Sequence, residues 1–101
     1  MKPATKAEKA HMARVAAFYC CVCKWFMGGI RSEAQVHHML RGGKRIGHFF
    51  TLPLCPTHHT GLGLTNEMRR LGIVPRSDSQ RAFEKAYDTE ANLHKRLLEE
   101  L

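Results

Sequence analysis

Residues 37–59 read HHMLRGGKRIGHFFTLPLCPTHH, and this stretch decides the fold. The apolar runs AQVHHML (34–40) and FFTLPL (49–54) are typical of two short strands, and Gly42-Gly43 marks the bend between them. The CPTHH segment that follows predicts a strand end passing into a helical turn, since proline suits an early helical position. We therefore expect a strand–bend–strand–helix unit with a His-His pair near each end.

The flanking segments predict helices. Thr5 followed by Glu8 is a capping box, and apolar residues recur at helical spacing after it. Ser77 with Gln80 is a second capping box, and leucines at spacing four continue the pattern toward the C-terminus. The expected α+β chain thus has an N-terminal helix, a cysteine knuckle with its loop, and a C-terminal helical segment, at residues 5–18, 20–33 and 77–101.

The charge balance favours a polyanionic partner. The 101 residues contain 16 Lys+Arg and 9 Asp+Glu, which gives a formal net charge of +7. A surplus of this size on a short chain favours nucleic acid as the partner. No apolar segment approaches the roughly 20 residues that span a membrane, and the N-terminus is too charged for a signal peptide. We therefore expect a cytoplasmic protein.

Four cysteines in a reducing compartment favour a metal site over disulfides. Cys20-x-x-Cys23 and Cys55-x-x-His58 each offer two ligands three positions apart. Together they form a Cys3His set, which suits a closed, structural, tetrahedral Zn²⁺ site. Cys21 is the spare thiol, and an exchange of roles with Cys20 stays open. The alternative is that the cysteines are small buried apolar residues.

The paired histidines predict a second metal site. Neighbouring side chains diverge by about 100° in a helical turn and point to opposite faces on a strand. If His58 binds the zinc, His59 faces elsewhere and can hold a second ion together with His37. An ion with few protein ligands keeps open positions, as catalytic ions do. His38 is then available to take a proton from water, because imidazole titrates near neutral pH.

The chain resembles the HNH nuclease family, which has a small zinc-stabilised ββα-metal, treble-clef-like core. The resemblance rests on CCVC, EAQVHHML, the GGKRIG bend and TLPLCPTHH. More narrowly, the chain is similar to the phage recombination-enhancement (Ref) nucleases through HMARVAAFYCCVC, HHMLRGGKRIGHF, TLPLCPTHH and RAFEKAYDTE, over residues 8–92. The resemblance implies one HNH-type domain over residues 1–101 with its core at 20–65.

Carried over to this sequence, the resemblance makes His37 and His59 ligands of a catalytic Mg²⁺, Mn²⁺ or Zn²⁺ and makes His38 the general base. It implies a metal-dependent endonuclease that hydrolyses phosphodiester bonds in DNA and leaves 5′-phosphate and 3′-hydroxyl ends. A RecA-type filament is the implied partner. The protein would be encoded by a phage or prophage and would act in the cytoplasm of the bacterial host.

Two positions depart from the HNH pattern. A further metal ligand usually follows the one at His59, but Gly63 occupies the position four residues on. Phe50 or Thr51 falls where the middle Asn of the motif would stand, and His48 is the nearest polar candidate on the hairpin. Three polar residues further along the chain are candidates for the third ligand, namely Asn66, Glu67 and Asp78.

Basic residues at the bend and beyond the predicted helical turn are candidate phosphate contacts. They are Arg41, Lys44, Arg45, Arg69, Arg70 and Arg76. Such contacts bind the backbone rather than the sequence, so affinity should fall steeply with salt. The alternative function is a non-catalytic zinc module that binds nucleic acid or a recombination protein. Trp25 and Phe26 are interpreted as local core rather than as a base-stacking platform.

Overall fold

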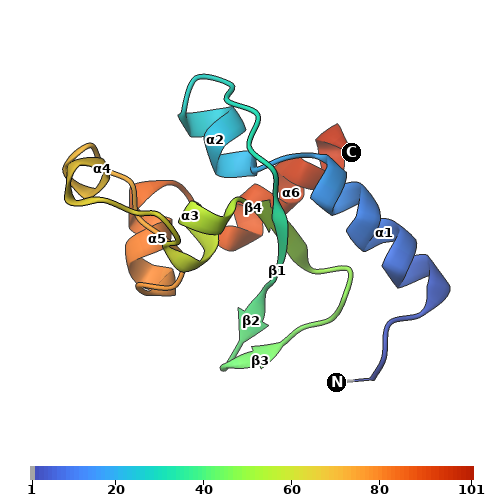
Figure 1. Ribbon diagram of the computed structural model, residues 1–101. Coiled ribbons are helices and arrows are strands. Elements are labelled where there is room, and N and C mark those ends of the chain that lie inside the picture. The colour runs from blue at the N-terminus through green and yellow to red at the C-terminus, as the bar shows by residue number, and fades with distance from the viewer. Residues whose placement is uncertain (1) are drawn as a thin grey trace.

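The computed structural model describes residues 2–101 and has a small α+β fold (Figure 1). The α+β prediction is therefore confirmed. No helix within the described part of the chain has the length and apolar character needed to cross a membrane. The elements in chain order are α1 (Lys6–Ala17), α2 (Cys21–Phe26), β1 (Gln35–His38), β2 (Leu40–Arg41), β3 (Lys44–Arg45), β4 (Thr51–Leu54), α3 (Pro56–Thr60), α4 (Asn66–Arg70), α5 (Gln80–Ala86) and α6 (Glu90–Glu100).

The central strands form an antiparallel pair. β1 pairs with β4, and the register sets His37 opposite Leu52 and His38 opposite Thr51. The strand expected at 34–40 is interrupted after His38, because the Met39 N–H turns to the carbonyl of Phe50 while its own carbonyl accepts from Ile46. The chain then continues into the β2–β3 hairpin.

The β2–β3 hairpin turns on the two glycines that the sequence places there. Gly42 and Gly43 have φ values of 59° and 77°. A two-residue hairpin turn of type I′ needs positive φ at both central residues, which glycine adopts without steric cost. In Figure 1 the hairpin projects away from α2. Its basic residues are exposed.

β4 is the centre of the core. All four of its residues are buried, since α1 and α6 both pack against it. A strand covered on both faces has an apolar run instead of an alternating pattern. Pro53 is compatible with this position because β4 is hydrogen-bonded along one edge only, to β1. Around Leu52 and Leu54 lie the fully buried side chains of α1, α2 and the C-terminal helices, namely Val15, Val22, Phe83 and Leu97.

The predicted helices are confirmed with two corrections. α1 begins after Thr5, and both hydrogen bonds of the Thr5–Glu8 capping box are present. The interpretation of residues 20–33 as knuckle and loop is wrong in its first part, where α2 forms. The Ser77 cap is also wrong: the Ser77 N–H donates to the carbonyl of His59, which holds this residue against α3. Helix α5 therefore starts two residues later, with Ser79 as its N-cap.

Candidate metal centre and histidine cluster

Four buried side chains converge on one point, and their ligand atoms all lie within 4.8 Å of one another: Cys20, Cys23, Cys55 and His58. The Sγ atoms of Cys23 and Cys55 are 3.9 Å apart, and Nδ1 of His58 lies 3.2–3.8 Å from the three sulfurs. Zn–S bonds of about 2.3 Å in a tetrahedron would separate two sulfurs by about 3.8 Å. The cluster thus has the size of a tetrahedral Cys3His zinc site, with Nδ1 as the ligand atom of His58.

The two halves of the cluster share one local structure. Cys20 and Cys55 are the N-caps of α2 and α3, each in an extended backbone conformation. Each Sγ accepts a hydrogen bond, at 3.5 Å, from the backbone N–H three residues on, which belongs to Cys23 or His58. Amides at a helix N-terminus stabilise negative charge, so both caps favour the thiolate that binds metal.

Charges within the cluster also suit a metal ion. Hydrogen bonds to Cys20 and Cys23, followed by that to His58, hold the pKa of Cys55 below its usual range. Burial would lower the pKa of His58, but its hydrogen bonds to Cys23 and Cys55 outweigh burial and raise the pKa to about 9. A proton bound there must leave when an ion binds.

Cys21 takes no part in the cluster. Its side chain is fully buried in the core and is not among the convergent ligands. Burial raises the pKa of its thiol to about 12, so it is a neutral apolar residue. This position closes the alternative in which Cys21 replaces Cys20.

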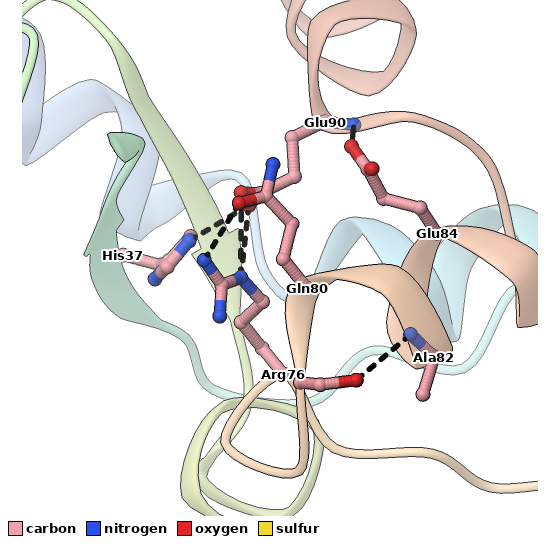
Figure 2. Close-up of polar contacts among 7 residues, drawn as sticks. His37, Arg76, Gln80, Ala82, Glu84 and Glu90 are labelled. Carbon is pink, nitrogen blue, oxygen red and sulfur yellow. Dashed lines mark hydrogen bonds and ion pairs between the residues drawn. The ribbon is translucent and has the colours of Figure 1, made fainter. Parts of the chain in front are cut away.

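His37 is held by a buried carboxylate from the C-terminal helix α6. Its Nε2 lies 2.9 Å from Oε2 of Glu90, whose carboxylate also accepts from Nε of Arg76 at 3.2 and 3.3 Å (Figure 2). Burial would raise the pKa of Glu90, but the hydrogen bond and charge of His37, with those of Arg76, lower it. An ionised carboxylate only accepts. When the His37 ring is neutral, its proton is therefore on Nε2, and Nδ1 keeps the lone pair.

His59 lies beside His37, with ring centroids 5.3 Å apart. Its Nδ1 is 2.8 Å from Oε1 of Gln35, and an amide oxygen only accepts, so Nε2 of His59 keeps the lone pair. Burial, followed by the charges of His37 and Arg76, lowers the pKa of His59 and keeps the ring neutral. Metal-ligating histidines usually have this arrangement, in which an oxygen acceptor binds the other ring N–H.

His38 has different partners from His37. Its Nε2 lies 3.0 Å from Nδ1 of His48, and Nε2 of His48 lies 3.1 Å from the backbone oxygen of Lys2. Burial, followed by the charges of Arg45, His48 and His37, lowers the pKa of His38. The expectation that neighbouring histidines diverge is confirmed for both pairs. His37 is bonded to Glu90 while His38 is bonded to His48. His58 faces the cysteines while His59 faces Gln35.

Two of the three residues considered for a third ligand form ion pairs elsewhere. Asp78 pairs with Arg69 at 2.8 Å, and Glu67 pairs with Arg70. Over residues 2–101, the Cys3His cluster is the one group in which three or more Cys, His, Asp or Glu ligand atoms converge. The histidine cluster thus offers two imidazole ligands, and its nearby carboxylate, Glu90, is a hydrogen-bond acceptor for one of them.

The six basic residues divide into two groups. Arg41, Lys44 and Arg45 are exposed on the hairpin, and no carboxylate of the described chain lies within ion-pair distance of them. The other three form ion pairs, and the side chain of Arg76 is only 14% exposed. The three hairpin cations are therefore the ones available to an anionic partner.

Trp25 and Phe26 pack within the molecule. Trp25 contacts the ring of Phe18 and the guanidinium of Arg96, and Phe26 packs on Tyr87. The interpretation as local core is confirmed for Trp25, which packs against the hydrophobic core, whereas Phe26 is 41% exposed.

Sequence reasoning missed Glu90, although one signal for it exists. Glu90 lies on the same face of α6 as Leu93 and Leu97, and all three are buried. A carboxylate on an apolar helical stripe is rarely buried unless it is paired, so its position indicates a buried cationic or imidazole partner. Nothing in the local sequence identifies that partner as His37, which lies 53 residues away.

Replacing Glu90 by alanine should destabilise the zinc-loaded protein by about 3–5 kcal/mol, because the change removes the carboxylate that pairs with Arg76 and His37 and leaves the buried guanidinium charge without its counter-ion. Urea unfolding followed by circular dichroism measures the loss. Glu67→Ala is the matched control, since its ion pair with Arg70 is exposed and worth about 0–1 kcal/mol. Equal stability of the two variants would show that the buried network adds nothing.

The fold and the cysteine–histidine cluster define a small α+β protein with four buried ligands that could hold a metal ion, an arrangement consistent with structural zinc. A family model described as recombination enhancement, RecA-dependent nuclease matches residues 4–101. The chain belongs to this family. Its name describes a nuclease that acts in recombination, with nucleic acid and RecA as partners. No curated protein matches the chain.

Proposed function

We propose that the chain is a metal-dependent DNA endonuclease of the HNH type, encoded by a phage or prophage and acting in the bacterial cytoplasm. In this proposal β1, β4 and α3 are the ββα-metal, treble-clef-like unit of a single domain, and the Cys3His cluster binds the structural zinc. The observation that carries it is the contact between His37 on β1 and His59 on α3, two imidazole rings with centroids 5.3 Å apart.

His37 and His59 would hold the catalytic ion, Mg²⁺, Mn²⁺ or Zn²⁺, through Nδ1 and Nε2 respectively. These are the nitrogens that Glu90 and Gln35 leave with a lone pair. Because the protein supplies few ligands, water and a phosphate oxygen can take the remaining positions. A bound ion would supply positive charge that stabilises the pentacovalent phosphate and the leaving oxygen.

His38 is the proposed general base. It removes a proton from a water molecule whose oxygen attacks phosphorus, and the bond from phosphorus to the 3′-oxygen breaks. The 3′-oxygen is then protonated from solvent, so the products carry 5′-phosphate and 3′-hydroxyl ends. Neighbouring positive charge and burial favour the neutral form of His38 that this step requires.

Arg41, Lys44 and Arg45 are the proposed phosphate contacts next to the site. They extend from the hairpin whose first strand follows His38 directly, and they are exposed and unpaired in the described chain. Arg69 and Arg70 can extend the contact surface, since exposed ion pairs are weak and exchange readily for a phosphate. Arg76 would act indirectly, by holding Glu90 against His37.

Replacing Lys44 by alanine should weaken DNA binding about equally for unrelated sequences and should reduce the slope of log K against log salt by about 1. Fluorescence anisotropy with labelled duplexes over a salt series measures both. Ala replacement of Lys85 on α5, which is exposed and outside the proposed surface, is the control for net charge. An equal change in both variants would assign the effect to overall charge and not to the hairpin.

A second candidate function is a non-catalytic zinc module that binds nucleic acid or RecA. One observation favours it: within residues 2–101 no third ligand converges with His37 and His59. Such a module would keep the Cys3His site and the basic hairpin and would use the histidine cluster only for packing.

Incubation of the zinc-loaded protein with supercoiled plasmid separates the two candidates. The assay needs arms with Mg²⁺, Mn²⁺ and excess chelator, each with and without a RecA filament assembled on DNA. Metal-dependent nicking or linearisation is the expected result, with the filament arm the most active. DNA or filament binding without cleavage in every arm would favour the module.

A further inference from the structure

We infer that His48 is a positioning residue for His38, and that it fixes the tautomer in which Nδ1 of His38 is the basic nitrogen. The inference rests on the proposed role of His38 as general base. It concerns a histidine on the loop between β3 and β4, in the region where the HNH pattern has an asparagine and this sequence has none.

The tautomer of His38 follows from a series of hydrogen bonds that ends at the backbone oxygen of Lys2. The backbone oxygen of Lys2 can only accept, so Nε2 of His48, 3.1 Å away, carries a proton. In neutral His48, Nδ1 then has the lone pair and accepts from Nε2 of His38 at 3.0 Å. The proton of neutral His38 is thereby placed on Nε2. Its Nδ1 is left unprotonated and can accept a proton from water.

The loop is built to hold His48 in this place. The backbone N–H of Phe50 donates to the carbonyl of Gly47, and the hydroxyl of Thr51 donates to the carbonyl of His48. These bonds tie both sides of His48 to the start of β4, which is buried. The rings of His38 and His48 meet edge to face, with centroids 5.2 Å apart and an interplanar angle of 78°.

The same residue links the proposed base to a cationic cavity. His48 lines a cavity of about 690 Å³ between the N-terminal segment and the hairpin, together with Lys2, Lys44 and Arg45. The backbone oxygen of Lys2 accepts the last hydrogen bond of the His38–His48 series. The side chain of Lys2 also places a positive charge beside the proposed DNA-contact surface. Both ring nitrogens of His48 are bonded within the protein, so its proposed role is to act through His38.

Two variants distinguish positioning from general stability. His48→Ala removes the acceptor, whereas His48→Asn keeps an acceptor oxygen at the position of Nδ1. In the plasmid assay we expect His48→Ala to lower kcat about 10- to 100-fold with little change in KM, the range typical of outer partners that orient a functional histidine. His48→Asn should recover most of this loss. His11→Ala, which removes a ring packed on Phe49 of the same loop, is the matched control and should keep wild-type kcat.

Nuclear magnetic resonance tests the His38–His48 hydrogen bond without a cleavage assay. In ¹⁵N-labelled, zinc-loaded protein, at a pH about two units above the ordinary imidazole value of about 6.5, His38 should show the Nε2–H tautomer. A coupling through the hydrogen bond should join Nε2 of His38 to Nδ1 of His48. His48→Ala should lose the slowly exchanging Nε2–H signal of His38, and His48→Asn should keep it.

The outcomes separate this inference from the proposed function. Absence of the coupling in the wild-type protein, or a His48→Ala kcat equal to that of the wild type, would overturn the positioning role while leaving nuclease activity intact. A wild-type protein that shows the coupling but cleaves no DNA in any arm would refute the proposed function, and with it a positioning role in cleavage. Zinc content and thermal unfolding of each variant exclude simple misfolding as the cause of a lower kcat.

Discussion

Replacing Cys55 by alanine is expected to abolish zinc binding and to leave the protein unfolded at room temperature. Structural Zn²⁺ contributes about 10–16 kcal/mol in small zinc domains, as much as the about 5–15 kcal/mol typical of whole-domain stability. Cys55 is both a ligand and the N-cap of α3, so its loss removes a Zn–S bond and the acceptor for the His58 N–H. Metal analysis and far-ultraviolet circular dichroism after gel filtration measure the two effects.

Cys21→Ala is the matched control for this prediction. Cys21 lies next to Cys20 and is just as buried, but it is not a ligand. The control should bind one zinc per chain and lose about 1 kcal/mol, the cost of shrinking a small buried side chain. If Cys55→Ala kept its zinc and its fold while Cys21→Ala lost them, the assignment of ligands would have to be exchanged.

Replacing His38 by alanine is expected to reduce DNA cleavage by about 10²–10⁴-fold, the usual contribution of a general base. Zinc content and DNA affinity should stay at wild-type values, because His38 is not a member of the Cys3His cluster and its ring is hydrogen-bonded to His48. Single-turnover cleavage at saturating protein separates the chemical step from binding. Undiminished cleavage by this variant would remove His38 from the mechanism.

His94→Asn serves as a control for the loss of an imidazole near the core. Nε2 of His94 is bonded to the carbonyl of Phe49, and His94 is not among the proposed ligands or bases. This variant should lose stability and keep its kcat when measured well below its melting temperature. If a His38 variant lost stability but kept its kcat, His38 would have only a structural role, as expected for His94.

The zinc site could be predicted from sequence because its information is local. The C-x-x-C and C-x-x-H spacings each describe one helical first turn, and both turns form with cysteine as N-cap. The same observation explains why α2 was not predicted. Cysteine is not among the usual N-cap residues, and six residues followed by Gly28-Gly29 are too few for a helical periodicity to be visible.

The surroundings of the histidines could not be predicted, because their contacts are distant in sequence. Glu90 is 53 residues from His37, and the backbone oxygen of Lys2 is 46 residues from His48. Spacing rules state which face of a strand or helix a side chain occupies, but not which distant segment covers that face. The proximity of His37 and His59 could be predicted, because the antiparallel strands β1 and β4 and the helical turn that follows β4 bring the two residues together.

The contact between Glu90 and His37 also determines how short a fragment of the protein can be and still keep the proposed metal site intact. Residues 20–65 contain both histidine pairs and all four zinc ligands, and would look like a portable module that could be excised or grafted. The carboxylate that orients His37 comes from α6, and the arginine that neutralises it comes from the connection before α5. A fragment cut at residue 65 would keep the ligands but would lose Glu90 and Arg76, so the C-terminal helices are part of the proposed metal site.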